Sequence, residues 1–134
     1  ACTKALVEKF GITADRDGML SIIPGVDAEE EQIVRDLIDI FFDAVNAGDE
    51  AAMEVVEIMA NQGAKFITAH IRNQQFDCDV IDVVLSGSIH TKLPSDKYIE
   101  VLKEKTQLLS GRKCNFIKLN VAPVTGCINW MLEN

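Results

Sequence analysis

The chain has 134 residues, of which 48% are hydrophobic, and its formal net charge is −8. This length suits a single domain, and the hydrophobic fraction is sufficient for a packed core. The acidic balance argues against a nucleic-acid backbone or an anionic membrane surface as a partner, because like charges repel. No apolar run reaches the roughly 18 residues that a membrane span needs, and no signal peptide is visible.

The four cysteines are Cys2, Cys78, Cys114 and Cys127. They are far apart and form no CxxC pair, which argues against a zinc site, so no metal ligands are predicted. Cys114 falls in a predicted strand and Cys127 on a predicted helix. We therefore expect both to be buried thiols of a protein in the reducing cytoplasm.

The chain is predicted to begin with a short helix and an irregular segment. Apolar residues at helical spacing predict a helix over residues 2–10, and Gly11 ends it. Residues 11–27 hold several aspartates and glycines and a proline, which favour a loop. A short extended piece is expected within this loop, over residues 20–23.

A long amphipathic helix is predicted from about residue 28 to Asn46. Asp27 should cap this helix, with Glu30 three residues later completing a capping box. The acidic residues 29–31 fall in the first turn, where carboxylates complement the helix dipole. The apolar stripe that should face the core comprises Ile33, Val34, Leu37, Ile38, Phe41, Phe42 and Val45.

Gly48 ends this helix, and Asp49 caps a second long helix over residues 50–73. Its predicted inner stripe comprises Ala52, Val55, Val56, Met59, Gly63, Phe66, Ile67 and His70. A glycine inside a helix costs about 1 kcal/mol relative to alanine, so we expect another element to cross closely at Gly63. The position of His70 on the stripe predicts a packed histidine rather than a catalytic one.

The next stretch carries the candidate site. Residues 80–85 form a short apolar run rich in β-branched side chains, which predicts a buried strand. Ser86-Gly87-Ser88 follows as a turn of small residues, where the backbone could approach a ligand closely. His90 could face that ligand, although a solvated loop position is favoured. Asp82 could lie at a strand edge or near a cleft, although a solvated or capping role is favoured.

One more helix, a strand and a terminal helix complete the chain. The helix is predicted over residues 95–109, with Ser95 or Asp96 as its cap. A second strand is predicted over residues 114–121, and after a loop the last helix covers residues 126–132. The predicted inner face of the helix before this strand comprises Tyr98, Val101, Leu102, Leu108 and Leu109.

This order of elements predicts an α/β fold with a short parallel sheet flanked by long helices. Strands separated by a helix should be parallel and joined by a right-handed crossover. In open α/β sheets ligands bind at the carboxyl ends of the strands, which makes residues 86–88 the candidate site. Two strands are few for such a sheet, so we expect the elements that extend it to lie outside this chain.

The chain lacks the common catalytic signatures. The sequence contains no Walker A, GxGxxG, HExxH or GxSxG pattern. Taken alone, the residues therefore predict an α/β domain with a candidate ligand-binding turn, and they indicate no particular reaction.

Three segments together show a resemblance to a known superfamily. The segment 83–88, Val-Val-Leu-Ser-Gly-Ser, resembles the adenosine motif of the actin-like ATPases, which include sugar kinases, Hsp70 and actin. The segment 121–127 resembles the P-x-x-G-A stretch that opens the last helix in the N-acetylglucosamine kinase and BadF/BadG/BcrA/BcrD ATPase branch. Residues 46–52 resemble the A-x-x-G-D-x-x-A joint between two helices of that branch. The order of the segments is that of the family, and the likeness covers residues 28–134.

The sequence departs from the family pattern at two positions. Ser86 stands where the first glycine of a Gly-Gly pair is usual, and Cys127 stands where an alanine is usual. Both residues are small, so the backbone can still approach a ligand closely.

The resemblance implies that this chain is an RNase H-like C-terminal subdomain, incomplete on its own. The missing N-terminal part of the parent ATPase would supply both phosphate motifs, which are absent here. ATP and Mg²⁺ would be the cofactors of the intact parent, and the reaction would be phosphoryl transfer to a sugar or a similar small molecule, or ATP hydrolysis coupled to another protein. Ser86, Gly87, Ser88 and Ile89 would form part of the adenine and ribose wall. The chain itself would hold no catalytic residues and no metal.

A non-catalytic α/β interaction module that keeps the fold without the nucleotide is the alternative. An open turn at Ser86-Gly87-Ser88 favours nucleotide binding, whereas a turn packed under a side chain favours the module. In either case the open edges of a two-stranded sheet recruit partners. We therefore expect the free chain to hide these edges or to self-associate, with a homodimer as the simplest form.

Overall fold

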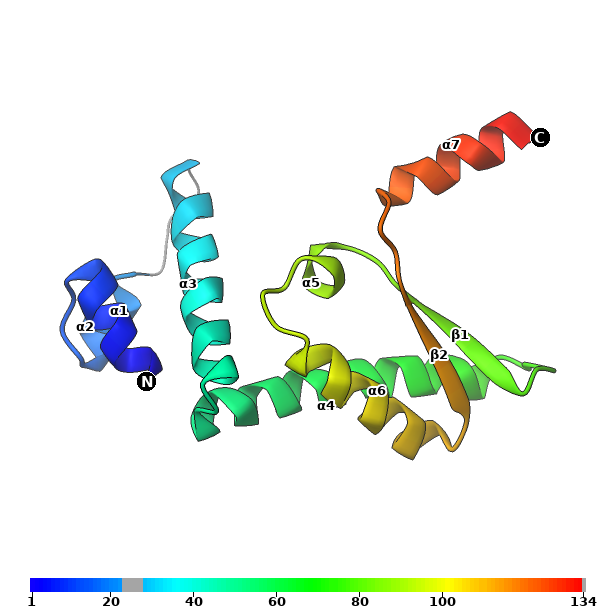
Figure 1. The fold of residues 1–134 in the computed structure, drawn as a ribbon, viewed down its shortest axis with the longest axis horizontal. Helices are drawn as coiled ribbons and strands as arrows, with labels where there is room; N and C mark the ends of the chain where they lie inside the picture. Colours follow the sequence, from blue (N-terminus) through cyan, green and yellow to red (C-terminus); the bar gives the residue numbers. More distant parts are fainter. Residues whose placement is uncertain (23–27, 134) are drawn as a thin grey trace. The chain divides into compact units, whose positions relative to one another are not determined.

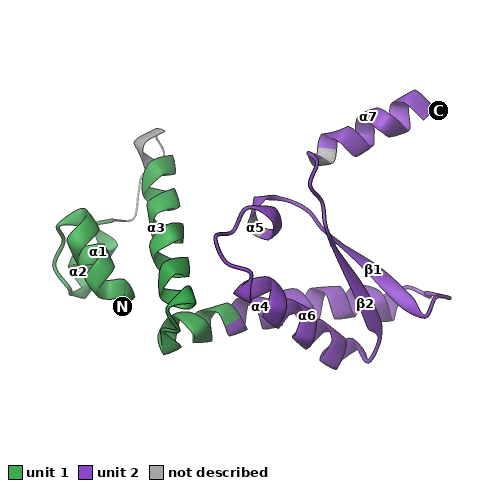
Figure 2. Cartoon of the chain, in the orientation of Figure 1, with its two compact units in different colours: residues 1–56 green, residues 57–134 purple. Residues whose placement is uncertain are grey.

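The computed structural model describes residues 1–22 and 28–133, without the side chains of residues 28–30, 89 and 123. The described chain is α/β and mostly helical, and it forms two compact units, residues 1–56 and 57–134 (Figure 2). The elements, labelled in Figure 1, are α1 (Cys2–Phe10), α2 (Arg16–Leu20), α3 (Ala28–Asn46), α4 (Glu50–Asn73), β1 (Val80–Leu85), α5 (Ser88–Thr91), α6 (Lys97–Ser110), β2 (Lys113–Lys118) and α7 (Pro123–Glu133).

The first unit begins as predicted, and then departs from the prediction. Helix α1 ends at Gly11, which has a φ of 65° and donates its N–H to the Val7 carbonyl. The expected loop is wrong over residues 16–20, which form α2. The extended piece expected over residues 20–23 is wrong for residues 20–22, which are helix and turn, and residue 23 lies outside the described residues. Asp15 caps this helix, because its carboxylate accepts the Gly18 N–H at 2.8 Å. The sequence reading overlooked this aspartate as a cap.

The two long helices α3 and α4 have the predicted ends. Gly48, with a φ of 77°, donates to the Val45 carbonyl, and the Asp49 N–H bonds the Ala44 carbonyl. This pair of bonds is the Schellman motif, which satisfies carbonyls at a helix end. The predicted cap of α3, Asp27, and the side chain of its partner Glu30 lie outside what the structure describes.

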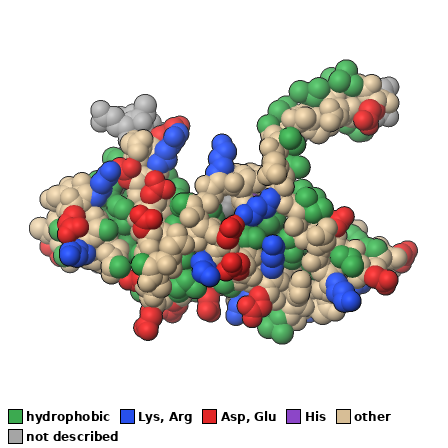
Figure 3. All heavy atoms as spheres, in the orientation of Figure 1, with side chains coloured by type: hydrophobic (Ala, Val, Ile, Leu, Met, Phe, Trp, Pro, Cys, Tyr) green, Lys and Arg blue, Asp and Glu red, His purple; other side chains and the backbone are tan. Residues whose placement is uncertain are grey.

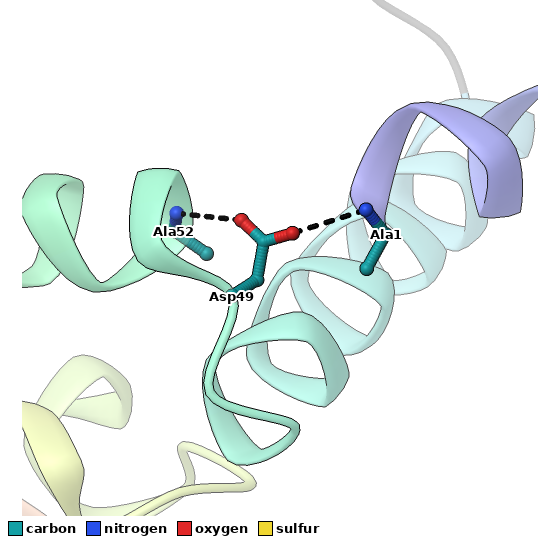
Figure 4. Close-up of polar contacts among 3 residues, drawn as sticks. All are labelled: Ala1, Asp49 and Ala52. Carbon is teal, nitrogen blue, oxygen red and sulfur yellow. Dashed lines mark hydrogen bonds and ion pairs between the residues drawn. The ribbon is translucent and has the colours of Figure 1, made fainter.

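Asp49 caps α4, as predicted, and makes a second contact within the first unit. One carboxylate oxygen accepts the Ala52 N–H at 3.1 Å, and the other lies 3.0 Å from the N-terminal ammonium of Ala1 (Figure 4). The hydrogen bond from that ammonium, followed by the bond from Ala52, lowers the pKa of Asp49. Asp49 thus ties Ala1, the residue before α1, to the start of α4.

The buried face of α4 differs from the predicted stripe. This face consists mostly of small side chains. Its members are Ala52, Val56, Ala60, Ala64, Thr68 and Ile71. Phe66, which was expected inside, is 70% exposed, and His70 is also exposed, so the prediction of a packed histidine is wrong. Alanines carry little hydrophobic signal in a sequence, yet a face of small residues lets another helix approach closely.

That close approach occurs where it was predicted. A Cβ built at Gly63 would lie 2.9 Å from Cδ1 of Leu102 and 3.2 Å from the hydroxyl oxygen of Tyr98, both on α6. The side chains of α6 that face inward are Tyr98, Ile99, Leu102 and Thr106. Leu108 was predicted to join them but is 75% exposed. Helix α6 ends at Ser110, one residue beyond the predicted end, and Gly111, with a φ of 66°, is its C-cap.

The sheet of the second unit consists, in the described residues, of β1 and β2 in parallel, as predicted. Val80 lies opposite Lys113, and Leu85 lies opposite Lys118. The second strand is shorter than predicted, since it ends at Lys118 and not at residue 121. The Leu119 N–H still donates to the Leu85 carbonyl at 2.9 Å, so the two carboxyl ends stay paired.

The end of the chain also differs from the prediction. Helix α7 begins at Pro123, three residues before the predicted start at Gly126. All of its described side chains except Thr125 are exposed, and Figure 3 shows hydrophobic groups along its surface. Cys127 lies on this helix and is exposed, so the prediction of a buried thiol is wrong for it, and Cys114 is only half-buried. No described helix is long and apolar enough to cross a membrane.

Candidate functional site

The turn after β1 is open. Ser86, Gly87 and Ser88 are exposed, and Gly87 has a φ of 88° and a ψ of 161°. A left-handed φ of this kind favours glycine, because a side chain would strain the backbone. A Cβ built at Gly87 meets no atom within 4 Å. Apart from the two neighbouring residues, no described atom therefore occupies the position of a side chain at Gly87.

Gly87 is also the N-cap of the short helix α5, which was not predicted. Its carbonyl accepts the N–H groups of His90 and Thr91, both at 3.1 Å, and the Thr91 hydroxyl at 3.0 Å. These three bonds hold the turn in one conformation. The hydroxyls of Ser86 and Ser88 have no hydrogen-bond partner among the described residues, so both are available to a ligand.

His90 attaches this turn to the core of the second unit. Its ring stacks on Tyr98 of α6, with the ring centroids 5.9 Å apart and an angle of 22° between the planes. The histidine is half-buried, which corrects the favoured interpretation of a solvated loop residue. Burial lowers the pKa of His90 and raises the pKa of Tyr98. Nδ1 of His90 is inaccessible to solvent and has no hydrogen-bond partner within the described chain.

Asp82 has a structural role in the sheet. Its Oδ1 accepts a hydrogen bond from Nδ2 of Asn115 at 2.9 Å, and the two residues lie opposite each other in the parallel register. Asp82 is exposed and lies in mid-strand, three residues before the strand ends at Leu85. We therefore leave it out of the candidate site. The backbone of Ile89 lies in α5, and its side chain is outside the described residues.

An open pocket of about 460 Å³ lies at the other end of the strands. It is lined by residues that precede the two strands, from 71–77 and from 110–112. Its two guanidinium groups already bind backbone carbonyls: Arg112 donates to Cys78 at 2.6 Å, and Arg72 donates to Leu109 at 2.8 Å. These arginines brace the carboxyl ends of α4 and α6, so the pocket has a structural explanation.

The chemistry available at the turn is limited to binding. Within residues 1–22 and 28–133, no group of three or more His, Cys, Asp or Glu side chains could hold a metal ion. The turn offers two hydroxyls, exposed backbone and open space, which suit contact with a hydroxylated or planar ligand. No protein-family model, curated protein or solved structure matches the chain.

Proposed function

We propose that this chain is the nucleotide-binding, RNase H-like C-terminal part of an actin-like ATPase of the sugar-kinase type. The observation that carries the proposal is the open turn at the carboxyl end of β1, where Gly87 has a φ of 88° and no neighbour within 4 Å of a Cβ. In open α/β sheets ligands bind at this end of the strands. The resemblance of residues 83–88 to the adenosine motif gives the ligand its identity as ATP.

The proposed contacts follow from the groups that the turn presents. The Ser86 and Ser88 hydroxyls would bond the ribose or the adenine edge, and the backbone of Gly87 would pass close to the base. Ile89 is proposed to complete this wall through its apolar side chain. The stack of His90 on Tyr98 would hold the turn in place without touching the nucleotide.

Phosphoryl transfer would take place in the intact parent, with Mg²⁺ bound at the phosphates. Such transfer depends on positioning and on electrostatic stabilisation of the phosphoryl group. The phosphate motifs that would provide both are expected in the part of the parent outside this chain. The chain itself would therefore contribute affinity for the nucleotide and no catalytic group.

A titration of ATP against two glycine variants tests this proposal. Gly87→Val should weaken ATP binding in the intact parent by more than tenfold, about 1.4 kcal/mol, because its side chain would occupy the space meant for the base. Gly111→Val is the control: its φ is also positive, at 66°, a Cβ there also meets nothing within 4 Å, and it lies at the carboxyl end of α6, outside the candidate turn. Gly87, with a ψ of 161°, occupies a region that essentially only glycine adopts, whereas Gly111, with a ψ of 13°, lies in the αL region, so both variants should lower the melting temperature and Gly87→Val should lower it more. Only Gly87→Val should weaken ATP binding by the protein that remains folded.

Unchanged ATP affinity in a well-folded Gly87→Val protein would remove the adenosine assignment. Equal losses of affinity in the two variants would do the same, since unfolding would then explain both.

The interaction module is a second candidate, favoured by a different observation. Seventeen large hydrophobic residues of the described chain are exposed, and five of them lie on α7. Such surfaces mark contacts with other proteins. The module would be supported over the ATPase part if ATP bound neither to the isolated chain nor to the intact parent, and if the chain formed a stoichiometric complex with another protein through α7.

A further inference from the structure

The sheet of the second unit has one covered face and one bare face. On the inner face Ile81 and Leu85 are buried at 3% and 4% exposure, and α6 packs against β2 there. The side chains of the other, outer face are all exposed; they are Val80, Asp82, Val84, Lys113, Asn115 and Ile117. Three of these six are large aliphatic groups. Parallel sheets occur almost only with both faces covered, so the outer face lacks a layer.

Helix α7 carries an apolar stripe of the kind that such a layer needs. Val124, Ile128, Met131 and Leu132 follow the spacing that puts residues on one side of a helix. Their exposed fractions are between 51% and 80%. All four side chains are apolar, so burying this stripe would be favourable.

The connection places this stripe within reach of the outer face. Only residues 119–122 separate β2 from α7, and loops of two to six residues are usual between a strand and the helix packed on its sheet. The six residues of β2 rise about 20 Å, and the 11 residues of α7 rise about 16 Å. If α7 turns back along β2, it therefore covers nearly the full length of that strand.

Charge agrees with this antiparallel course. Glu133 is the only charged residue of α7 and lies at its end. Lys113 lies on the outer face at the start of β2, which is where the end of a returning α7 arrives. The carboxylate would thus meet the ammonium group, while the apolar stripe lies over Val84 and Ile117.

We propose that α7 folds back over the outer face of the sheet as its missing layer. The stripe of Val124, Ile128, Met131 and Leu132 covers Val80, Val84 and Ile117, and Glu133 pairs with Lys113. The proposal concerns the chain's own helix and is independent of nucleotide binding. A second copy, whose α7 could cover this face by exchange, is the other possible occupant and is an outcome of the test.

Thiol labelling of two cysteines on the same helix tests the proposal. In a Cys127→Ser background, Ile128→Cys places a thiol in the stripe, and Gly126→Cys places one on the opposite side of α7. A Cβ at Gly126 meets nothing within 4 Å, so the control fits without strain. The rate of reaction with a water-soluble disulfide reagent is followed at each site by mass spectrometry. We expect Ile128→Cys to react at least tenfold more slowly than Gly126→Cys, at a rate independent of protein concentration.

Two further changes test which surface protects the thiol. Val84→Asp on the outer face should bring the rate at Ile128→Cys to within about twofold of the rate at Gly126→Cys. Lys113→Glu should speed the reaction about twofold to fivefold, as expected for an exposed ion pair, and Glu133→Lys should reverse that effect.

Equal rates at the two cysteines in a chain that keeps its helical circular dichroism would overturn the proposal. Protection that appears only as the protein concentration rises would overturn it in favour of a second copy. Protection that survives Val84→Asp would mean that α7 packs on another surface, and a failure of Glu133→Lys to reverse Lys113→Glu would rule out the antiparallel course.

Discussion

His90 shows how one residue joins the candidate turn to the core. Its ring stacks on Tyr98, and Nδ1 is buried without a partner among the described residues. Both ring nitrogens carry a proton in the charged imidazolium, so charging His90 would place an N–H at Nδ1, where no described group accepts its hydrogen bond. Burial accordingly lowers the pKa of His90 below its ordinary 6.5.

This gives a prediction for stability against pH. The unfolded chain binds the proton more readily than the folded chain. Neutral His90 should therefore make its full contribution to the free energy of unfolding above pH 6.5, and that contribution should be lost as the pH falls through the lower pKa of the folded state. His90→Phe keeps a ring over Tyr98 but does not titrate, so its melting temperature should fall less than that of the wild type between pH 7.5 and about pH 5. Parallel slopes for His90→Phe and the wild type would refute the effect.

Asp49 gives a second prediction, because its two contacts can be removed separately. Asn is nearly as good an N-cap as Asp, so Asp49→Asn should keep the bond to Ala52 and lose the pair with the Ala1 ammonium. Asp49→Ala should lose both. Melting temperatures at neutral pH should fall in the order wild type, Asn, Ala, with the larger step, a few degrees, from Asn to Ala.

The pH dependence of the same variants checks the ion pair. The pKa of Asp49 is lowered from 3.8 in the folded chain, so its charged form stabilises the fold above pH 3.8 and that stabilisation is lost as the pH falls below it. The wild type and Asp49→Asn should then converge in acid. A constant difference down to the lowest pH at which the chain is folded would contradict this.

At the scale of elements, the crossing of α4 and α6 depends on Gly63. Leu102 is 1% exposed and Tyr98 is 6% exposed, so neither can move away easily from a new side chain. Gly63→Leu should destabilise the chain by about 1–3 kcal/mol, the usual cost of overpacking. Gln62→Leu, the exposed neighbour on the same helix, should change stability by less than about 0.5 kcal/mol. Urea unfolding measures both, and equal effects would mean that the crossing is loose.

At the scale of the whole molecule, a test of catalysis by the chain alone follows from its motifs. The chain has no phosphate-loop motif, and its described residues hold no cluster that could bind a metal. We predict that the chain alone neither hydrolyses ATP nor phosphorylates sugars. Phosphate release with Mg-ATP and a panel of hexoses and hexosamines measures this. Turnover above a buffer blank that Gly87→Val abolishes would show that the chain is complete as an enzyme.

The sequence by itself determined the features that depend on a few neighbouring residues. Glycines at 11, 48 and 111 end helices because they adopt a left-handed φ that other residues avoid. The run over residues 80–85 is a strand because β-branched side chains suit a pleated backbone. The parallel pairing followed from the intervening helix, since a hairpin cannot join parallel strands.

Only the tertiary structure decided which faces are buried and what surrounds the turn. Phe66 and Leu108 are exposed while Ala60, Ala64 and Thr106 are buried, because burial depends on the shape of the opposing element and not on the hydrophobicity of one residue. The stack of His90 on Tyr98 joins α5 to α6 through contacts that no local spacing encodes. The open space at Gly87 has the same origin. Three small residues predict the turn, but whether the space beside Gly87 is open depends on where the other side chains lie.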